Sequence, residues 1–184
     1  MGPDHKPQLS WRVAILPYLG EEEMALYGQF MLGEPWDSPH NKALLAKMPE
    51  VYAPLGGIRR ASYTTSYHVF RGRGTVFEGA QGIRWDKVTD GTARTIMVIE
   101  GGEPVPWTKP KDLPFGPNTP LPELGGQFRK VFLVAFCDGS VRVLSQDLDR
   151  ERLRAAITRD AGDNIGPALG QGTGEALGRG GFIR

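Results

Sequence analysis

The sequence predicts an α+β fold in which a helical N-terminal part packs on an antiparallel sheet and a C-terminal helix follows the last hairpin. Apolar residues in the first third recur at helical spacing between capping serines and helix-ending prolines. From residue 62 onward, runs of β-branched and aromatic residues indicate strands. Two such runs meet at Asp138-Gly139, and an Asp-Gly pair between apolar runs is the strongest short-range hairpin signal.

Two short helices are expected first. Ser10 can cap a helix over residues 11–16 that Pro17 bends or stops, with a strand as the alternative there. Three glutamates then suit the N-terminus of a second helix, over residues 21–32, where negative charge meets the positive end of the helix dipole. The residues expected on its buried face are Met24, Tyr27 and Met31.

A third helix is predicted after Ser38-Pro39. Serine is a good N-cap, and proline at the first helical position loses no hydrogen bond. Pro49 ends this helix, whose expected buried stripe is Leu44, Leu45 and Met48. The first third of the chain is therefore expected to be helical.

The strands are expected to lie at residues 62–70, 75–77, 95–100, 131–137 and 141–144. Asp138-Gly139 fits a type I′ turn and places a central hairpin late in the chain. Gly101-Gly102 is expected to end the strand over residues 95–100. Residues 103–128 contain seven prolines and predict a long surface loop that is either functional or specially packed.

The last helix is expected to begin at Asp149 as its N-cap and to end near Gly162. Residues 163–184 are rich in glycine and poor in apolar residues, so they are expected to form a flexible tail. The predicted organisation is a loose N-terminus at 1–9, one globular domain at 10–162 and this tail.

Composition excludes several function classes. The net charge of +1 offers no electrostatic case for nucleic acid or an anionic membrane. A single cysteine, Cys137, excludes an internal disulfide and a multi-cysteine zinc site, and we expect it to be a buried thiol. Asp90, Asp138 and Glu100 could ligate Ca²⁺, but turn chemistry accounts for both Asp-Gly pairs. No metal and no cofactor are therefore expected.

Trp36, Asp37, His40 and Trp107 are the candidate ligand-binding residues. Tryptophans in loop-like segments can form flat surfaces for sugars or protein partners, or can equally act as lids over a small core. His40 could act as a ligand or acid–base group, although local hydrogen bonding in the turn explains it as well. An enzymatic reading would need His40 or His68 near a carboxylate in a pocket. No catalytic residue is predicted.

Six motifs occur in a characteristic order, and together they resemble the soluble domain of a large bacterial family of prepilin-like (prepilin-type processing-associated) proteins of unassigned function. The motifs span about residues 9–162: Ser10-Trp-Arg-Val-x-Ile-Leu-Pro-Tyr-Leu19, Glu34-Pro-Trp-Asp-Ser-Pro-His-Asn41, Met48-Pro-x-Val-Tyr52, Thr89-Asp-Gly-Thr92, Val105-Pro-Trp-Thr-Lys-Pro-x-Asp-Leu-Pro114 and Ala135-Phe-x-Asp-Gly-Ser-Val-Arg142.

The resemblance implies a fold like the globular head of a pseudopilin, in which an antiparallel sheet follows a long apolar N-terminal helix. That helix is missing from the sequence, and Phe128 occupies a position where many family members carry histidine. The family suggests a cell-envelope or extracellular location, whereas the chain as it stands is expected to be soluble and possibly cytoplasmic.

The function that we expect is that of a non-enzymatic structural or interaction module that presents loops to protein partners. The alternative is a small-molecule or glycan-binding module that uses Trp36 and Trp107. The alternative requires both rings to converge on one cleft.

Overall fold

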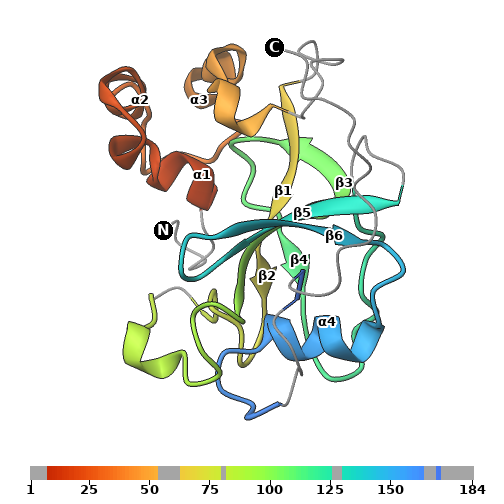
Figure 1. The fold of residues 1–184 in the computed structure, drawn as a ribbon. Helices are drawn as coiled ribbons and strands as arrows, with labels where there is room; N and C mark the ends of the chain where they lie inside the picture. The colour runs from red at the N-terminus through yellow and green to blue at the C-terminus, as the bar shows by residue number, and fades with distance from the viewer. Residues whose placement is uncertain (1–7, 54–62, 80–81, 126–129, 164–168, 171–184) are drawn as a thin grey trace.

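The computed structural model of the chain describes residues 8–53, 63–79, 82–125, 130–163 and 169–170, and the α+β prediction is confirmed. A four-stranded antiparallel sheet occupies the middle of the molecule (Figure 1). The N-terminal helices α1 to α3 lie on one side of it, and α4 lies on the other.

The chain begins with α1 (Trp11–Ala14) and a 3-10 turn, η1 (Leu16–Tyr18). The predicted helix is therefore present, and the alternative strand is not. The Ser10 hydroxyl accepts a hydrogen bond from the Arg12 amide and caps the helix, as its sequence position predicts.

Helix α2 (Glu21–Tyr27) is shorter than the predicted helix over 21–32, and its buried face differs from the prediction. Leu26 and Phe30 are buried, whereas Met24 and Met31 are exposed. The backbone leaves the helix at Gly28, so the predicted spacing no longer holds for residue 31. Two large apolar side chains consequently remain in solvent.

Helix α3 (Pro39–Ala43) is capped by the Ser38 hydroxyl, as predicted, and runs on into two 3-10 turns, η2 (Leu44–Lys47) and η3 (Glu50–Tyr52). Asn41 is fully buried and holds the preceding loop. Its side-chain oxygen accepts from the Met31 amide, and its amide nitrogen donates to three backbone carbonyls of residues 31–35. Because every polar atom of this side chain is bonded, its burial costs little.

The sheet has the strand order β1-β3-β5-β6, with β1 (Thr64–His68), β3 (Ile96–Pro106), β5 (Val131–Phe136) and β6 (Val141–Ser145). The predicted strand over 62–70 is interrupted at Val69, after which β2 (Phe70–Arg71) pairs in parallel with β4 (Leu113–Pro114). The predicted strand at 75–77 is reduced to a single bridge between Thr75 and Thr158. A short 3-10 turn, η5 (Trp85–Lys87), precedes β3.

The predicted hairpin is confirmed, but its turn type and its central place are not. Only Gly139 has a positive φ, at 84°, whereas a type I′ turn needs positive φ at both central residues. The Gly139 amide donates to the Phe136 carbonyl, and the Phe136 amide donates to the Ser140 carbonyl. This is a three-residue loop with a left-handed glycine. Strand β5 lies inside the sheet, but β6 forms its edge.

Strand β3 does not end at Gly101-Gly102, as predicted, but continues to Pro106. A Cβ atom at Gly101 would lie 2.9 Å from Leu124 Cδ2 and 3.1 Å from the Glu123 carbonyl oxygen. Because Gly101 has no side chain, residues 123 and 124 can pack directly against β3. The predicted loop over 103–128 consequently begins within β3 and also contributes β4.

Two apolar clusters form the core. The first lies between the sheet and α4 (Arg150–Ile157), which Asp149 caps as predicted. It also contains Leu169, so the expectation of a flexible tail does not hold at that residue. Residues 171–184 and 1–7 lie outside the described residues. The second cluster joins the N-terminal helices to the end of β3, and its members are Val13, Leu16, Leu26, Phe30, Leu44, Tyr52 and Trp107.

Candidate functional site

Trp107 belongs to the core and not to a binding surface. Its side chain is fully buried, its ring stacks on Tyr52 with centroids 5.8 Å apart, and Phe30 packs edge-on against it. The Trp107 indole Nε1 donates to the Leu45 carbonyl at 3.1 Å. The prediction of Trp107 as a ligand-binding residue is wrong, because its ring fills the space between the helices and the sheet.

The other three predicted residues lie on the surface without forming a shared cleft with Trp107. The Lys109 ammonium covers the half-buried ring of Trp36, with Nζ 5.1 Å from the ring centroid. Asp37 is exposed. His40 is also exposed, and its Nε2 donates to the Gln29 carbonyl at 2.8 Å. The convergence of Trp36 and Trp107 that a glycan site requires is therefore not observed.

A buried polar cluster joins the N-terminal helices to the sheet. Arg12 Nη2 lies 3.3 Å from Asp112 Oδ1, and their side chains are 0% and 2% exposed. The same Asp112 oxygen accepts from the Trp11 indole at 3.1 Å and from the Val69 amide at 3.3 Å. Arg12 also donates to the Tyr67 carbonyl of β1, through Nε at 3.0 Å and through Nη2. We call Arg12, Asp112 and His68 the buried polar cluster.

His68 completes this cluster but offers no surface to a substrate. Its Nδ1 lies 3.9 Å from Asp112 Oδ1, its Nε2 donates to the Glu103 carbonyl, and its side chain is only 2% exposed. Burial and the positive charge of Arg12 both lower the pKa of His68, which favours the neutral imidazole. Burial also lowers the pKa of the Arg12 guanidinium. The histidine–carboxylate pair thus lies in the protein interior.

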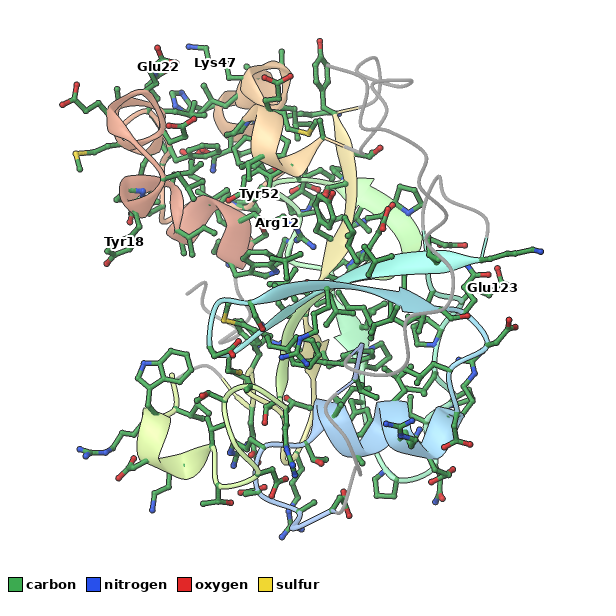
Figure 2. All side chains as sticks on the ribbon, viewed as in Figure 1. Arg12, Tyr18, Glu22, Lys47, Tyr52 and Glu123 are labelled. Atoms are coloured by element: carbon green, nitrogen blue, oxygen red, sulfur yellow. The ribbon has the colours of Figure 1, made fainter. Side chains whose placement is uncertain are left out.

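Three of the sequence motifs meet at or beside this cluster. Ser10 Oγ donates to the Trp107 carbonyl at 2.8 Å, and the Tyr52 hydroxyl donates to the Arg12 carbonyl at 2.7 Å. Figure 2 shows Arg12 and Tyr52 directed into the space between the helices and β1. The motif residues therefore fix the helices on the sheet, and they leave the outer surface of the helices free for contacts.

That outer surface carries exposed apolar side chains. Of the ten large apolar residues that are exposed in the described structure, five fall within residues 18–32. We call them the helical apolar surface: Tyr18, Leu19, Met24, Met31 and Leu32. Tyr18 is 86% exposed and points away from the protein (Figure 2). Sequence periodicity missed this surface, because it assigned Met24 and Met31 to the core.

A small hollow of about 220 Å³ adjoins this surface between α1 and the chain after α2. Its lining is mainly apolar and comprises Gln8, Leu9, Ser10, Val13, Ala14, Tyr27 and Leu32. Glu21 and Glu22 are exposed at the start of α2, between Leu19 and Met24 of the helical apolar surface in the sequence. Exposed carboxylates among exposed apolar groups can accept an apolar group that carries positive charge next to it.

Two larger hollows, of about 470 and 430 Å³, lie beside α4 and are lined with charged and polar side chains. In the larger one, the Arg154 guanidinium already has partners within the protein. It donates to the carbonyls of Thr119, Gly116 and Pro117 and lies over the Phe115 ring. Within the described residues, no group of three or more His, Cys, Asp or Glu side chains is placed to bind a metal.

Glu100 is a buried carboxylate on the face of the sheet away from α4. Its Oε2 accepts from the Leu133 amide at 3.2 Å, where the backbone pairing of β3 and β5 has ended at Ile99 and Val134. The Glu100 carboxylate thus accepts the hydrogen bond that a backbone carbonyl of β3 would accept if the strand pairing continued. Burial raises the pKa of Glu100 and also the pKa of neighbouring Tyr67.

We predict that Glu100→Gln becomes progressively more stable relative to the natural protein as the pH rises. The folded-state pKa of Glu100 is raised above its ordinary value of 4.5, so the folded chain holds the proton more tightly and loses stability as pH increases through that value. Glutamine keeps the acceptor for Leu133 but does not titrate. Urea unfolding from about pH 4 to 8 measures the difference.

The matched control for this measurement is Glu103→Gln, because the Glu103 side chain is 90% exposed. It should leave the pH dependence of unfolding unchanged. A constant difference between Glu100→Gln and the natural protein across this pH range would contradict the prediction.

Comparisons with known protein families find a similarity in the helical part of the chain. Residues 2–55 match the model of a family described as a protein of unknown function (DUF1559). This range contains all the helices from α1 to η3, and hence the helical apolar surface. No curated protein and no solved structure matches the chain. In the described parts of the chain, every helix is too short or too polar to cross a lipid bilayer.

Proposed function

We propose that the protein is a non-enzymatic interaction module, similar to the globular head of a pseudopilin, that binds a protein partner through the helical apolar surface. The exposure of five large apolar side chains within residues 18–32 carries this proposal. Exposed apolar groups that gather in one part of a surface mark protein contacts more often than single scattered ones.

Three further observations support this role. The buried polar cluster holds the helices on the sheet, so the surface is presented by a fixed support. The family match covers the segment that carries the surface. The acidic side chains of Glu21 and Glu22 favour a partner with basic residues around an apolar contact. Trp36 follows Leu32 by four residues and is half-buried, with Lys109 over its ring, and this pair can extend the contact.

Site-specific photo-crosslinking in the native cells tests the proposal. A photoreactive residue at position 18 should give a discrete adduct with a partner protein, whereas one at Glu123 should not. Both positions are exposed, and Figure 2 places them on different sides of the molecule. Equal adducts from both positions, or none from position 18, would exclude this surface as the binding site.

For a partner identified in this way, Tyr18→Ser and Met24→Ser should each weaken binding at least tenfold, because exposed aromatic and methionine side chains are frequent anchors of interfaces. Titration calorimetry measures the affinity. Both side chains are more than half exposed, so the thermal midpoint of the free protein should change little. Val51→Ser is a matched control, because Val51 is 58% exposed but lies outside the surface.

A further inference from the structure

The sheet ends at a strand whose outer edge is unpaired within the described residues. Strand β6 is last in the strand order. The Phe136 amide donates to the Ser140 carbonyl, and bonded pairs alternate along an antiparallel ladder, so the even-numbered residues of β6 bond to β5. The N–H and C=O groups of Val141 and Val143 therefore face away from the sheet, where a further strand can bond to them.

The side chains along this edge are apolar and open to solvent. Val141 is 66% exposed and Val143 is 45% exposed. They stand opposite Ala135 and Leu133 of β5, which are half-buried. Many edge strands are protected by lysine, proline or a bulge, but β6 contains neither residue type and pairs with β5 in unbroken register. Such an edge readily accepts a further strand.

The two ends of this edge are acidic. Asp138 lies in the turn before β6 and Asp147 lies just after the strand, and both are exposed. The only basic side chain within residues 138–147 is Arg142, and it turns toward the core. Its guanidinium donates to the Leu169 carbonyl at 2.8 Å and lies over the Phe136 ring. The open edge is therefore apolar at its centre and negatively charged at each end.

We propose that β6 binds an extended segment of another protein as a further strand, and that this segment has apolar residues at alternate positions and a basic residue at each end. Main-chain hydrogen bonds to Val141 and Val143 hold the segment, and its apolar side chains cover the two valines. Its basic ends lie beside Asp138 and Asp147. Since β6 has five residues and is about 17 Å long, a segment of about seven residues spans the edge.

The same charges disfavour pairing of β6 with a second copy of β6. An antiparallel pair centred on Val143 would place Asp138 of one copy opposite Leu148 of the other, between Asp147 and Asp149. All three aspartates are exposed at the ends of the strand, so the two copies would bring like charges together. A foreign segment with basic ends is therefore the better occupant.

The open edge is a different part of the molecule from the helical apolar surface. β1 and β6 are the two outer strands of the sheet, and the helical part contacts β1 through η3. The proposal for β6 does not rest on binding by the helical apolar surface, so either proposal can fail alone.

Amide hydrogen exchange with a synthetic peptide tests the proposal. The probe is the end-capped peptide Arg-Val-Thr-Val-Thr-Val-Arg, and an NMR titration gives its dissociation constant. At a peptide concentration of about ten times that constant, the amides of Val141 and Val143 should exchange about tenfold more slowly than in the free protein. The amides of Arg142 and Leu144, which bond to β5, serve as internal controls and should change little.

Matched peptides separate backbone pairing from charge. Methyl groups on the valine amide nitrogens remove the donors that face β6, so this peptide should not slow the exchange. A peptide with glutamate in place of both arginines should bind about tenfold more weakly at low salt, and added salt should reduce the difference.

Variants of the protein locate the site. Val141→Lys should weaken binding of the basic peptide without unfolding the protein, because the Val141 side chain is mostly exposed. Asp147→Asn should weaken it and reduce its salt dependence. Glu22→Gln is the matched control, because Glu22 is an exposed acidic residue on α2, and it should leave binding unchanged.

Four results would overturn the proposal. The first is an absence of saturable binding up to about 5 mM peptide, and the second is equal binding of the basic and acidic peptides. The third is slow exchange of Val141 and Val143 in dilute protein without peptide, because the chain itself would then close the edge. The fourth is slow exchange that disappears on dilution, because a second copy would then be the occupant.

Discussion

Replacing Asp112 by alanine is expected to destabilise the protein by about 3–5 kcal/mol, because the buried guanidinium of Arg12 loses its counter-charge. The Trp11 indole and the Val69 amide lose their acceptor in the same step. A loss of this size is a large fraction of the stability of an ordinary domain, so partial unfolding at room temperature is expected. Urea unfolding followed by circular dichroism measures it.

Two comparisons make this test specific. Asp86→Ala should change stability by less than about 0.5 kcal/mol, because Asp86 and its partner Arg84 are mostly exposed. Adding Arg12→Met to Asp112→Ala should recover part of the loss, because the unpaired buried charge is then removed. A cost of less than about 1 kcal/mol for Asp112→Ala alone would show that the cluster does not hold the helices.

Trp107→Ala is expected to destabilise the protein by about 3–5 kcal/mol, because it empties the centre of the second apolar cluster. The cost includes the stacking on Tyr52 and the hydrogen bond from the indole to Leu45. Trp107→Phe keeps a ring in the cluster and should cost less. Thermal and urea unfolding measure both variants.

The control for Trp107 is Trp85→Ala, because the Trp85 side chain is 61% exposed in η5. Its unfolding midpoint should stay close to that of the natural protein. Similar losses for the two tryptophan variants would contradict the assignment of Trp107 to the core. They would also reopen the interpretation of both tryptophans as surface residues.

Features with a local cause could be predicted from the sequence. Ser10, Ser38 and Asp149 cap the helices that follow them, because a side-chain oxygen next to free backbone amides acts within one turn. The Asp138-Gly139 hairpin depends on a glycine that tolerates positive φ. Each of these depends on residues only a few positions apart.

Features that depend on distant residues could not be predicted. The burial of Trp107 depends on Tyr52 and Phe30, which lie more than fifty residues earlier. Helical spacing in residues 21–32 favoured Met24 for the core, but the structure exposes Met24 and buries Leu26, which packs with residues distant in the sequence such as Tyr52 and Trp107. The role of Asp112 had one sequence signal, its place in the motif over 105–114, but its partner Arg12 lies 100 residues away.

The long sequence separation between α1 with its cap and the residues that they bond to has a consequence for folding. Ser10, Trp11 and Arg12 bond to residues 97 to 101 positions later in the chain. Helices of four to seven residues, such as α1 and α2, do not persist alone in water. Residues 10–27 leave the ribosome well before residue 112, yet they are among the last to acquire native structure, and their apolar side chains stay accessible to chaperones until residue 112 has emerged.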